Sequence, residues 1–288
     1  MSIIPFLVLL AVTVPPDYKA QIEKWRADRE ARLKSDTGWL TVAGLFWLQE
    51  GANSIGTSES DRIQLPKPAP EHAGDIEFRG GKATLRLRPG VSAQVNGQPA
   101  QTAVLKSDAE TDGKPDLVTL GGLTFFVIQR GERSGIRLKD KNAEMRRDFK
   151  GLDWYPVNPE WRIVAKWVKY PQPKHVEMDS MTGDKEKAVV PGYALFSVEG
   201  KEYRLEPTEE GEELFFVFRD KTAGKTTYPA ARFLYSKSEG DHVVLDFNKA
   251  YNPPCAFTPF ATCPLPTPEN RLPIEIPAGE LKYKGGHH

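Results

Sequence analysis

The sequence predicts a mainly β protein that begins with one helix and continues into two β domains. The 24 glycines and 24 prolines among its 288 residues favour turns and short strands over long helices. Short alternating segments, at residues 83–87, 93–95 and 123–128, are separated by Gly80-Gly81, Asn96-Gly97 and Gly121-Gly122, which are typical turn sequences. At about 150 residues per domain, the length corresponds to roughly two domains.

The charge balance excludes one class of function. Lysines and arginines number 39, and aspartates and glutamates also number 39, so the formal net charge is zero. Nucleic-acid binding driven by bulk charge needs an excess of basic residues. We therefore expect no nucleic-acid partner.

An apolar run without charged residues occupies residues 3–14. It is too short for a membrane span, which needs about 20 apolar residues, and the small residues near Ala11 suit the end of a secretory signal. We expect residues 1–14 to be a signal segment, the mature chain to have no stable membrane span, and the protein to be periplasmic or secreted. The alternative is an N-terminal strand or helix that packs on the first domain.

Residues 15–50 are expected to form a helix followed by an apolar linker. Ile22, Trp25 and Leu33 recur among charged residues over 17–34, after Pro15-Pro16, which predicts a helix there. Residues 39–48 are too apolar to be exposed, so we expect them to pack on the sheet that follows.

Residues 51–150 are predicted to form a β-sandwich, and part of this region carries a distinctive set of motifs. They are Ile55-Gly56-Thr57, residues 60–65 (SDRIQL), the Glu71-His72-Ala73 corner, residues 95–98 (VNGQ) and residues 120–125 (LGGLTF). On these motifs, residues 54–128 resemble a forkhead-associated domain. The resemblance implies an eleven-strand type of β-sandwich and the binding of phosphothreonine peptides through loop residues.

Two departures from the forkhead-associated pattern remove the expected phosphate contacts. Thr57 stands where an arginine usually follows the first glycine, and residues 69–71 (APE) stand where a serine usually precedes the histidine corner. The charge-assisted hydrogen bonds that a phosphate needs are therefore missing. We expect a scaffold that binds no phosphopeptide, with His72 as a structural corner residue.

Residues 151–284 are predicted to form a second β domain. Strand-like runs recur at residues 162–170, 194–198, 202–205, 214–219, 231–235 and 242–247. Residues 251–280 hold eight of the 24 prolines, so they cannot form a regular helix or a central strand. Their aromatic and apolar side chains favour an ordered strap that closes the domain.

Several longer strings extend over both halves of the chain. They are residues 130–140 (RGERSGIRLKD), 218–224 (FRDKTAG), 246–257 (DFNKAYNPPCAF), 263–266 (CPLP), 269–272 (ENRL) and 278–280 (AGE). On these strings, residues 25–283 resemble the bacterial and archaeal family catalogued as domain of unknown function 1684. No activity is established for that family, so the resemblance implies membership and no reaction.

Polar residues at the start of the strap form a candidate ligand site. Asp246 and Asn248 alternate with an apolar residue and share one face if the strand persists, and Tyr251 and Asn252 follow at the strand end. With Arg232 as an anion contact, they predict a pocket for a small molecule. The alternative is that these side chains hydrogen-bond the backbone of the strap, whose carbonyls need partners.

Three arginines surround a Gly-rich hairpin at residues 130–137. Arg130, Arg133 and Arg137 could together grip a carboxylate or phosphate, and Arg137 is included among the ligand-binding candidates. The alternative is that such a group joins one domain to the next through salt bridges or carbonyl contacts.

The chain has two cysteines, Cys255 and Cys263, with seven residues between them. In an exported protein they predict a disulfide. A catalytic cysteine would need a base such as His175 or His242, but no spacing signature for that set is present. We expect no metal site and no cofactor, since His175-Val176-Glu177 offers two ligand types without an identifiable third.

These observations favour a protein that binds or processes a small ligand at the second β domain, near the strap and the groove between the domains. Two alternatives stay open. One is a non-enzymatic interaction or envelope-structural protein. The other is a hydrolase built on converging carboxylates such as Asp220, Asp246 and Glu280. Whether the protein is an enzyme is left open by the sequence.

Overall fold

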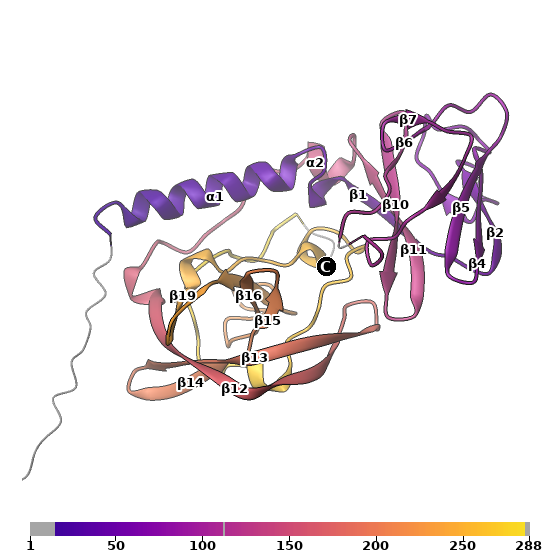
Figure 1. Ribbon diagram of the computed structural model, residues 1–288. Coiled ribbons are helices and arrows are strands. Elements are labelled where there is room, and N and C mark those ends of the chain that lie inside the picture. The colour runs from indigo at the N-terminus through magenta and orange to yellow at the C-terminus, as the bar shows by residue number, and fades with distance from the viewer. Residues whose placement is uncertain (1–14, 112, 286–288) are drawn as a thin grey trace, which may run out of the picture.

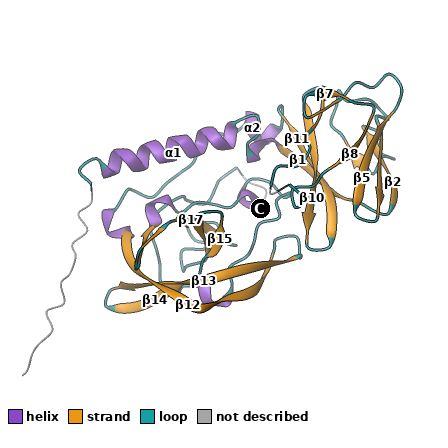
Figure 2. Ribbon diagram, in the orientation of Figure 1, coloured by secondary structure: helices purple, strands orange, loops and turns teal. Residues whose placement is uncertain are grey.

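The computed structural model describes residues 15–111 and 113–285, which form two lobes side by side (Figure 1). Strands β1 to β11 build the first lobe and strands β12 to β19 build the second. Helix α1 (Tyr18–Lys34) lies along the second lobe, and strands dominate both lobes (Figure 2). The prediction of a mainly β chain that begins with a helix is confirmed, while the domain boundaries stay predictions.

The predicted signal segment, residues 1–14, lies outside the described residues. Within the described part of the chain, none of the helices combines the length and the apolar character that crossing a membrane requires.

The first lobe is a sandwich of two sheets. The six-stranded sheet has the order β1-β11-β10-β9-β6-β7 and the five-stranded sheet has the order β3-β2-β4-β5-β8. The strands of the first sheet are β1 (Val42–Trp47), β6 (Gln94–Val95), β7 (Gln98–Pro99), β9 (Val118–Leu120), β10 (Leu123–Arg130) and β11 (Arg133–Asp140). Those of the second are β2 (Gly51–Gly56), β3 (Ile63–Gln64), β4 (Gly74–Arg79), β5 (Lys82–Leu87) and β8 (Thr102–Leu105).

Strand alternation explains how this lobe forms its core. Phe125 and Val127 of β10 and Ile136 and Leu138 of β11 point into one apolar cluster with side chains of the other sheet. The predicted turn at Asn96-Gly97 is confirmed, because both residues have positive φ, 51° and 80°, between the paired strands β6 and β7.

The apolar linker differs from its prediction. Residues 42–47 form strand β1, which pairs with β11 and so belongs to the first sheet instead of packing on its face. Pairing at a sheet edge satisfies the backbone hydrogen bonds of an otherwise apolar segment. Trp39, just before this strand in the short 3-10 helix η1 (Trp39–Thr41), packs against apolar clusters of the second lobe.

The second lobe also contains two sheets. The five-stranded sheet has the order β14-β13-β12-β19-β18, and the three-stranded sheet has the order β15-β16-β17. The strands are β12 (Arg162–Asp179), β13 (Lys185–Val198), β14 (Lys201–Leu205), β15 (Thr208–Glu210), β16 (Glu213–Phe218), β17 (Arg232–Ser236), β18 (Ser238–Glu239) and β19 (His242–Asp246). Phe216 and Phe218 of β16 face the core between the sheets, whereas Phe215 and Val217 face a second cluster on the outer side.

Strands β12 and β13 are longer than the sequence predicted. Pro171 and Pro173 lie inside β12, where the register with β13 shifts between Lys169 and Lys174. Proline is tolerated in a strand at such an irregularity because the ladder hydrogen bond is already interrupted there. The resulting long hairpin reaches the first lobe with its tip.

The proline-rich strap, residues 251–280, is ordered and follows the second lobe through isolated β-bridges at Tyr251, Pro264, Arg271 and Glu280. The remaining short elements are α2 (Glu144–Arg147), η2 (Pro159–Trp161), η3 (Phe247–Lys249), η4 (Pro254–Ala256) and η5 (Pro268–Asn270). Phe257, Leu272 and Ile276 of the strap are buried in the apolar clusters, as the aromatic and apolar composition of the segment led us to expect.

Candidate functional site

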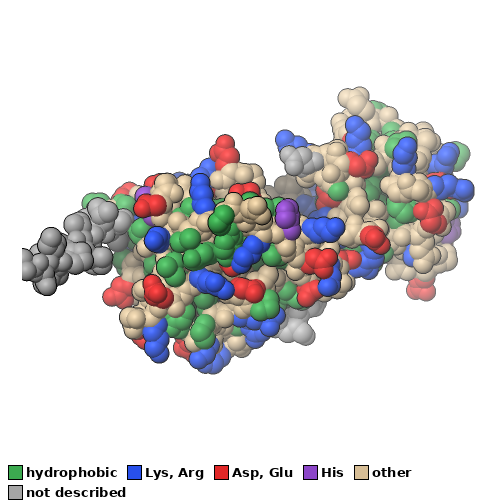
Figure 3. Space-filling view, turned by 60° about the horizontal axis from the view of Figure 1, so that its bottom comes forward, with side chains coloured by type: hydrophobic (Ala, Val, Ile, Leu, Met, Phe, Trp, Pro, Cys, Tyr) green, Lys and Arg blue, Asp and Glu red, His purple; other side chains and the backbone are tan. Residues whose placement is uncertain are grey.

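A cavity of about 1090 Å³ lies where the two lobes meet. Its walls come from α1, from the β10–β11 hairpin, from the first residues of β13, from the three-stranded sheet and from the strap. The volume is slightly above the usual range for small-molecule sites, roughly 300–1,000 Å³. Charged side chains of both signs cover the junction of the lobes, while hydrophobic side chains gather on the second lobe (Figure 3).

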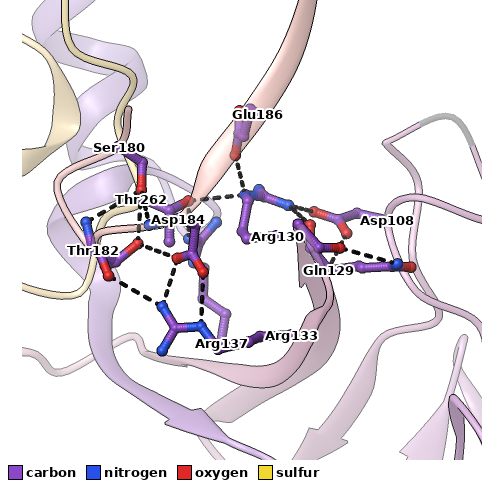
Figure 4. Close-up of polar contacts among 11 residues, drawn as sticks. Asp108, Gln129, Arg130, Arg133, Arg137, Ser180, Thr182, Asp184, Glu186 and Thr262 are labelled. Atoms are coloured by element: carbon purple, nitrogen blue, oxygen red, sulfur yellow. Dashed lines mark hydrogen bonds and ion pairs between the residues drawn. The ribbon is translucent and has the colours of Figure 1, made fainter. Parts of the chain in front are cut away.

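Two of the three hairpin arginines join the lobes. Arg133 donates to both carboxylate oxygens of Asp184 at the tip of the β12–β13 hairpin, at 2.7 and 2.6 Å (Figure 4). The Arg133 guanidinium also lies 3.9 Å from the centre of the Trp47 ring. Arg130 forms an ion pair with Asp108 at 2.7 Å and a longer one with Glu186 at 3.4 Å. These contacts match the alternative in which the arginines hold one domain against the next.

Arg137 has different surroundings. Alternation along β11 places it on the same side as Arg133, away from the sandwich core. It is only 5% exposed, donates from Nη2 to the Thr262 hydroxyl at 3.2 Å, and lies 5.0 Å from the centre of the Trp39 ring. Among the described residues it has no ion-pair partner, and its Nε has no hydrogen-bond partner. Burial, reinforced by the charge of Arg130, lowers the pKa of Arg137 to about 10.

One hydroxyl connects the arginines to the strap. Thr262 Oγ1 accepts hydrogen bonds from Arg130 Nε at 2.9 Å and from Arg137 Nη2 at 3.2 Å. Thr262 immediately precedes Cys263, and both line the cavity. The two guanidinium groups therefore share this strap residue as a hydrogen-bond acceptor.

Aromatic side chains also line the cavity. Phe215 and Tyr235 stack with ring centres 4.6 Å apart and planes 20° apart, and Tyr235 continues the stack to Tyr251 at 6.4 Å and 13°. The Arg29 guanidinium lies 4.2 Å from the centre of the Tyr251 ring. The Tyr235 hydroxyl donates to Glu210 at 2.5 Å. Burial raises the pKa of both tyrosines, so they stay neutral hydrogen-bonding and stacking groups.

Asn252 also lines the cavity and is fixed by a buried cluster. Its Nδ2 donates to Glu280 Oε1 at 2.9 Å and to the Leu281 carbonyl at 2.7 Å, and its own carbonyl accepts from Arg29 at 2.9 Å. Arg29 also pairs with Glu280 at 2.6 Å. Asn252 Oδ1 has no partner among the described residues.

The predicted ligand residues thus divide into two groups. Arg137, Tyr251 and Asn252 line the cavity, whereas Asp246, Asn248 and Arg232 do not. Asp246 and Asn248 belong to a buried network at the start of α1. In it the Tyr18 hydroxyl donates to Asp246 at 2.7 Å, and Asn248 bonds the backbone N–H and carbonyl of Asn158 at 2.9 and 2.8 Å.

Arg232 forms a separate buried cluster. It pairs with Asp220 at 2.6 Å and donates to the carbonyls of Ile276 and Ala278 in the strap. Gly279 follows with φ of 84°, and a Cβ there would lie 2.8 Å from an Arg232 nitrogen and 2.3 Å from the Ala250 carbonyl oxygen. Only glycine fits so close an approach, so this cluster fixes the strap to the second lobe.

The carboxylates proposed for a hydrolase lie in three different networks. Asp220 pairs with Arg232, Glu280 pairs with Arg29, and Asp246 accepts from Tyr18. The carboxylates that line the cavity are those of Glu132, Glu186 and Glu210. Burial raises the pKa of Glu186.

The two cysteines lie next to one another, and both carry free thiols. The Cys255 backbone N–H donates to Cys263 Sγ at 3.3 Å. Cys263 is buried and lines the cavity, whereas Cys255 is half-buried. The predicted disulfide stays a prediction.

Sequence reasoning missed several cavity residues. Arg29, Trp39, Glu186 and Tyr235 come from four distant segments of the chain. In the sequence, Arg29 belonged to the predicted helix, Tyr235 to a predicted strand and Trp39 to the apolar linker, while Glu186 lay outside the predicted elements. The spaced arginines at residues 130–137 and the polar residues at the start of the strap were the local signals near this place.

Comparison with known proteins places the chain in a family. The family model described as "Protein of unknown function (DUF1684)" matches residues 147–281. A solved structure of an uncharacterised protein from Haloarcula marismortui is 32% identical, covering 47% of this chain and 78% of that one, with a TM-score of 0.40. The chain belongs to this family. The DUF1684 family carries no assigned activity, and no curated protein matches the chain.

Other solved structures match about a third of the chain. A forkhead-associated domain from work on phosphothreonine-dependent interactions is 22% identical, covers 33% of this chain and 92% of that one, and has a TM-score of 0.24. The FhaA forkhead-associated domain, solved with the intracellular domain of another protein, is also 22% identical, covers 33% of this chain and 97% of that one, and has a TM-score of 0.24.

Proposed function

We propose that this DUF1684 protein binds a small organic anion with an aromatic body in the cavity between the lobes. The observation that carries the proposal is Arg137, a cation that is 95% buried, lines the cavity and has no ion-pair partner among the described residues.

A buried charge is costly unless an opposite charge and hydrogen bonds compensate it. The nearest carboxylates, Asp108 and Glu186, pair with Arg130, and Arg130 itself repels Arg137. A ligand carboxylate, sulfonate or phosphate would supply the missing negative charge and could accept a fork of two N–H donors.

The aromatic residues of the cavity lining favour an aromatic ligand body. Phe215, Tyr235 and Tyr251 present stacked rings, and Trp39 lies beneath Arg137. Rings of this kind contribute a large apolar area and an additional stacking energy of about 0.5–1.5 kcal/mol per pair. A ligand with a charged end and a flat ring would use both Arg137 and the aromatic side chains.

The structural alternative accounts for other residues. Arg133 holds the two lobes together through Asp184, and Arg232, Asp246 and Asn248 stabilise the second lobe. A purely structural role supplies no ion-pair partner for Arg137 among the described residues. For this reason the ligand-binding function is preferred over a purely structural one.

The test uses anilinonaphthalene sulfonate (ANS), a fluorescent aromatic sulfonate. We expect one ANS molecule to bind per chain. Arg137→Met should weaken binding about tenfold or more, since a hydrogen bond to a charged group contributes about 1.5–3 kcal/mol. Arg88→Met is the matched control, because Arg88 is exposed on the first lobe and lies outside the cavity.

Two results would overturn the proposal. One is the absence of stoichiometric ANS binding by the folded protein. The other is equal weakening of ANS binding by Arg137→Met and Arg88→Met, which would show that only surface charge matters.

We also propose export to the periplasm or medium, on the apolar run at residues 3–14. Expression in a bacterial host with fractionation tests this. Recovery of a shortened chain outside the cytoplasm supports export, and a full-length chain in the cytoplasm contradicts it.

A further inference from the structure

Beside the cavity, the strap carries two nucleophilic side chains that ligand binding does not use, and one of them, Cys263, lines the cavity. Cys255 and Cys263 are the two cysteines of the chain. They are held in hydrogen-bonding contact by the backbone of the strap, with the Cys255 N–H 3.3 Å from Cys263 Sγ. We propose that they form a redox site, in which a small-molecule disulfide oxidises the dithiol and thereby weakens anion binding in the adjacent cavity. The link between oxidation and anion binding rests on the proposed function, whereas the formation of the disulfide does not.

The two thiols have unequal surroundings, as a reversible pair requires. Cys255 is half-buried and therefore within reach of a small molecule, whereas Cys263 is buried. The hydrogen bond from the Cys263 thiol lowers the pKa of Cys255, and burial raises the pKa of Cys263 well above its usual value. The thiolate is the attacking species in disulfide exchange, so Cys255 attacks first and Cys263 resolves.

The reaction balances with a disulfide oxidant of the form RSSR. The Cys255 thiolate attacks one sulfur of RSSR, forming a mixed disulfide and releasing RS⁻. The Cys263 thiol then loses its proton, and its sulfur attacks Cys255 Sγ, which releases the second RS⁻. The two thiol protons of the protein end on the two released thiols, so the protein loses two electrons and RSSR gains them.

Thr262 couples this pair to the anion site. It precedes Cys263 directly, and its hydroxyl accepts from Arg130 at 2.9 Å and from Arg137 at 3.2 Å. A disulfide brings the sulfurs to about 2.05 Å, closer than any hydrogen bond between them. Closing it pulls Cys263 toward Cys255 and shifts Thr262, which disturbs the spacing of the two guanidinium groups. Misplacement of a binding group by about 1 Å is enough to weaken a preorganised site.

The experiment uses the full chain and oxidised glutathione as the disulfide. The protein is equilibrated in mixtures of reduced and oxidised glutathione, quenched with acid, and its free thiols are counted after denaturation. ANS binding is titrated at both ends of the series. We expect both thiols to be lost together without retained glutathione, and the dissociation constant for ANS to rise about threefold or more in the oxidised protein.

Cys255→Ser provides the matched control, since it removes the attacking thiol at a half-buried position. Its ANS dissociation constant should not change between the reduced and oxidised mixtures. Cys263→Ser is a second variant that should retain one glutathione on Cys255, because the resolving thiol is gone. If Cys263→Ser fails to fold, wild type and Cys255→Ser still decide the question.

Each outcome is decisive. Two free thiols that survive excess oxidised glutathione overturn the redox site. A disulfide that leaves ANS binding unchanged or tighter overturns the coupling. Failure of the reduced protein to bind ANS overturns the proposed function and the coupling with it, while the thiol count still decides the disulfide on its own.

Discussion

Arg137 and Arg232 are both almost fully buried, at 5% and 1% exposed, yet the molecule treats them differently. Arg232 in the second lobe pairs with Asp220 and donates to two strap carbonyls. Arg137 at the junction of the lobes donates to one hydroxyl and has no ion-pair partner among the described residues. A buried charge that the fold neutralises indicates a structural role, whereas one left open toward a cavity indicates a role that a ligand completes.

The polar side chains of the strap repeat this contrast. Asn248 bonds Tyr18 and both backbone groups of Asn158, so it closes a network within the second lobe. Asn252, four residues later, uses its amide nitrogen in the same way but leaves its Oδ1 unpaired within the described structure. The hydrogen bonds of Asn248 therefore stabilise the fold, whereas Asn252 has an unpaired Oδ1 and lines the cavity.

The largest expected effect is on Arg232. Arg232→Leu leaves Asp220 charged and buried without its partner, which should lower the free energy of unfolding by about 3–5 kcal/mol. Urea unfolding followed by tryptophan fluorescence measures this against Arg88→Leu, an exposed control on the first lobe. A loss below about 1 kcal/mol would show that the Arg232 cluster is not structural and would remove the contrast with Arg137.

The sequence predicted most of the fold because local patterns determine it. Polarity alternation located strands β5, β6 and β10 of the first lobe, and Asn96-Gly97 located a hairpin turn. The reach of β12 through Pro171 and Pro173 was not predictable, because it depends on where the pairing with β13 shifts register, and local sequence patterns do not show that. The edge pairing of β1 was missed for the same reason, since it is made with β11, about ninety residues away.

The sequence predicted the candidate site only in part. A cavity lies beside the strap and between the lobes, and Tyr251, Asn252 and Arg137 are among the residues that line it, while ligand binding there stays a prediction. Asp246 and Asn248 share a chain neighbourhood with Tyr251 but turn toward the start of α1. Proximity in the sequence cannot tell which side chains face the cavity and which face α1, because this depends on the distant element that packs on each side chain.

A smaller loss of stability is expected at Asn248. Asn248→Ala leaves the backbone N–H and carbonyl of Asn158 without their partners, which should cost about 1–3 kcal/mol. ANS binding should stay unchanged, because Asn248 lies outside the cavity. Chemical unfolding and an ANS titration on the same sample separate the two roles, and unchanged stability combined with weaker ANS binding would restore Asn248 as a ligand residue.

Arg137→Met should change stability by less than about 1 kcal/mol, because the lost Thr262 hydrogen bond is offset by removal of an uncompensated buried charge. The same variant is the one expected to lose ANS binding. Thermal unfolding in the absence of ligand measures the effect. A loss as large as that of Arg232→Leu would mean that Arg137 is a structural residue and that the two arginines are alike.

The smallest expected effect is the change of ANS affinity with pH. Burial raises the pKa of Glu186, with Asp184, Asp108 and Glu210 adding to the rise and Arg130 opposing it. Ionised Glu186 cancels part of the positive charge of Arg130, so an anion should bind more tightly once Glu186 is protonated. ANS is a sulfonate that stays charged over this range, and its affinity should therefore rise about two- to fivefold as the pH falls through the pKa of Glu186.

Glu186→Gln separates this carboxyl from its neighbours. The variant should bind ANS more tightly than wild type at neutral pH, and its ANS affinity should lack most of the pH dependence.

The free energy of unfolding provides an independent test. A raised pKa means that the folded state binds more protons than the unfolded state between the two pKa values. The contribution of Glu186 to the stability of the folded state is therefore most favourable in acid, and it is lost as the pH rises through the pKa of Glu186 in the folded state. Glu186→Gln should stabilise the chain at neutral pH and not in acid. Identical pH profiles for the variant and the wild type would show that another group near Arg130 controls the charge of the cavity.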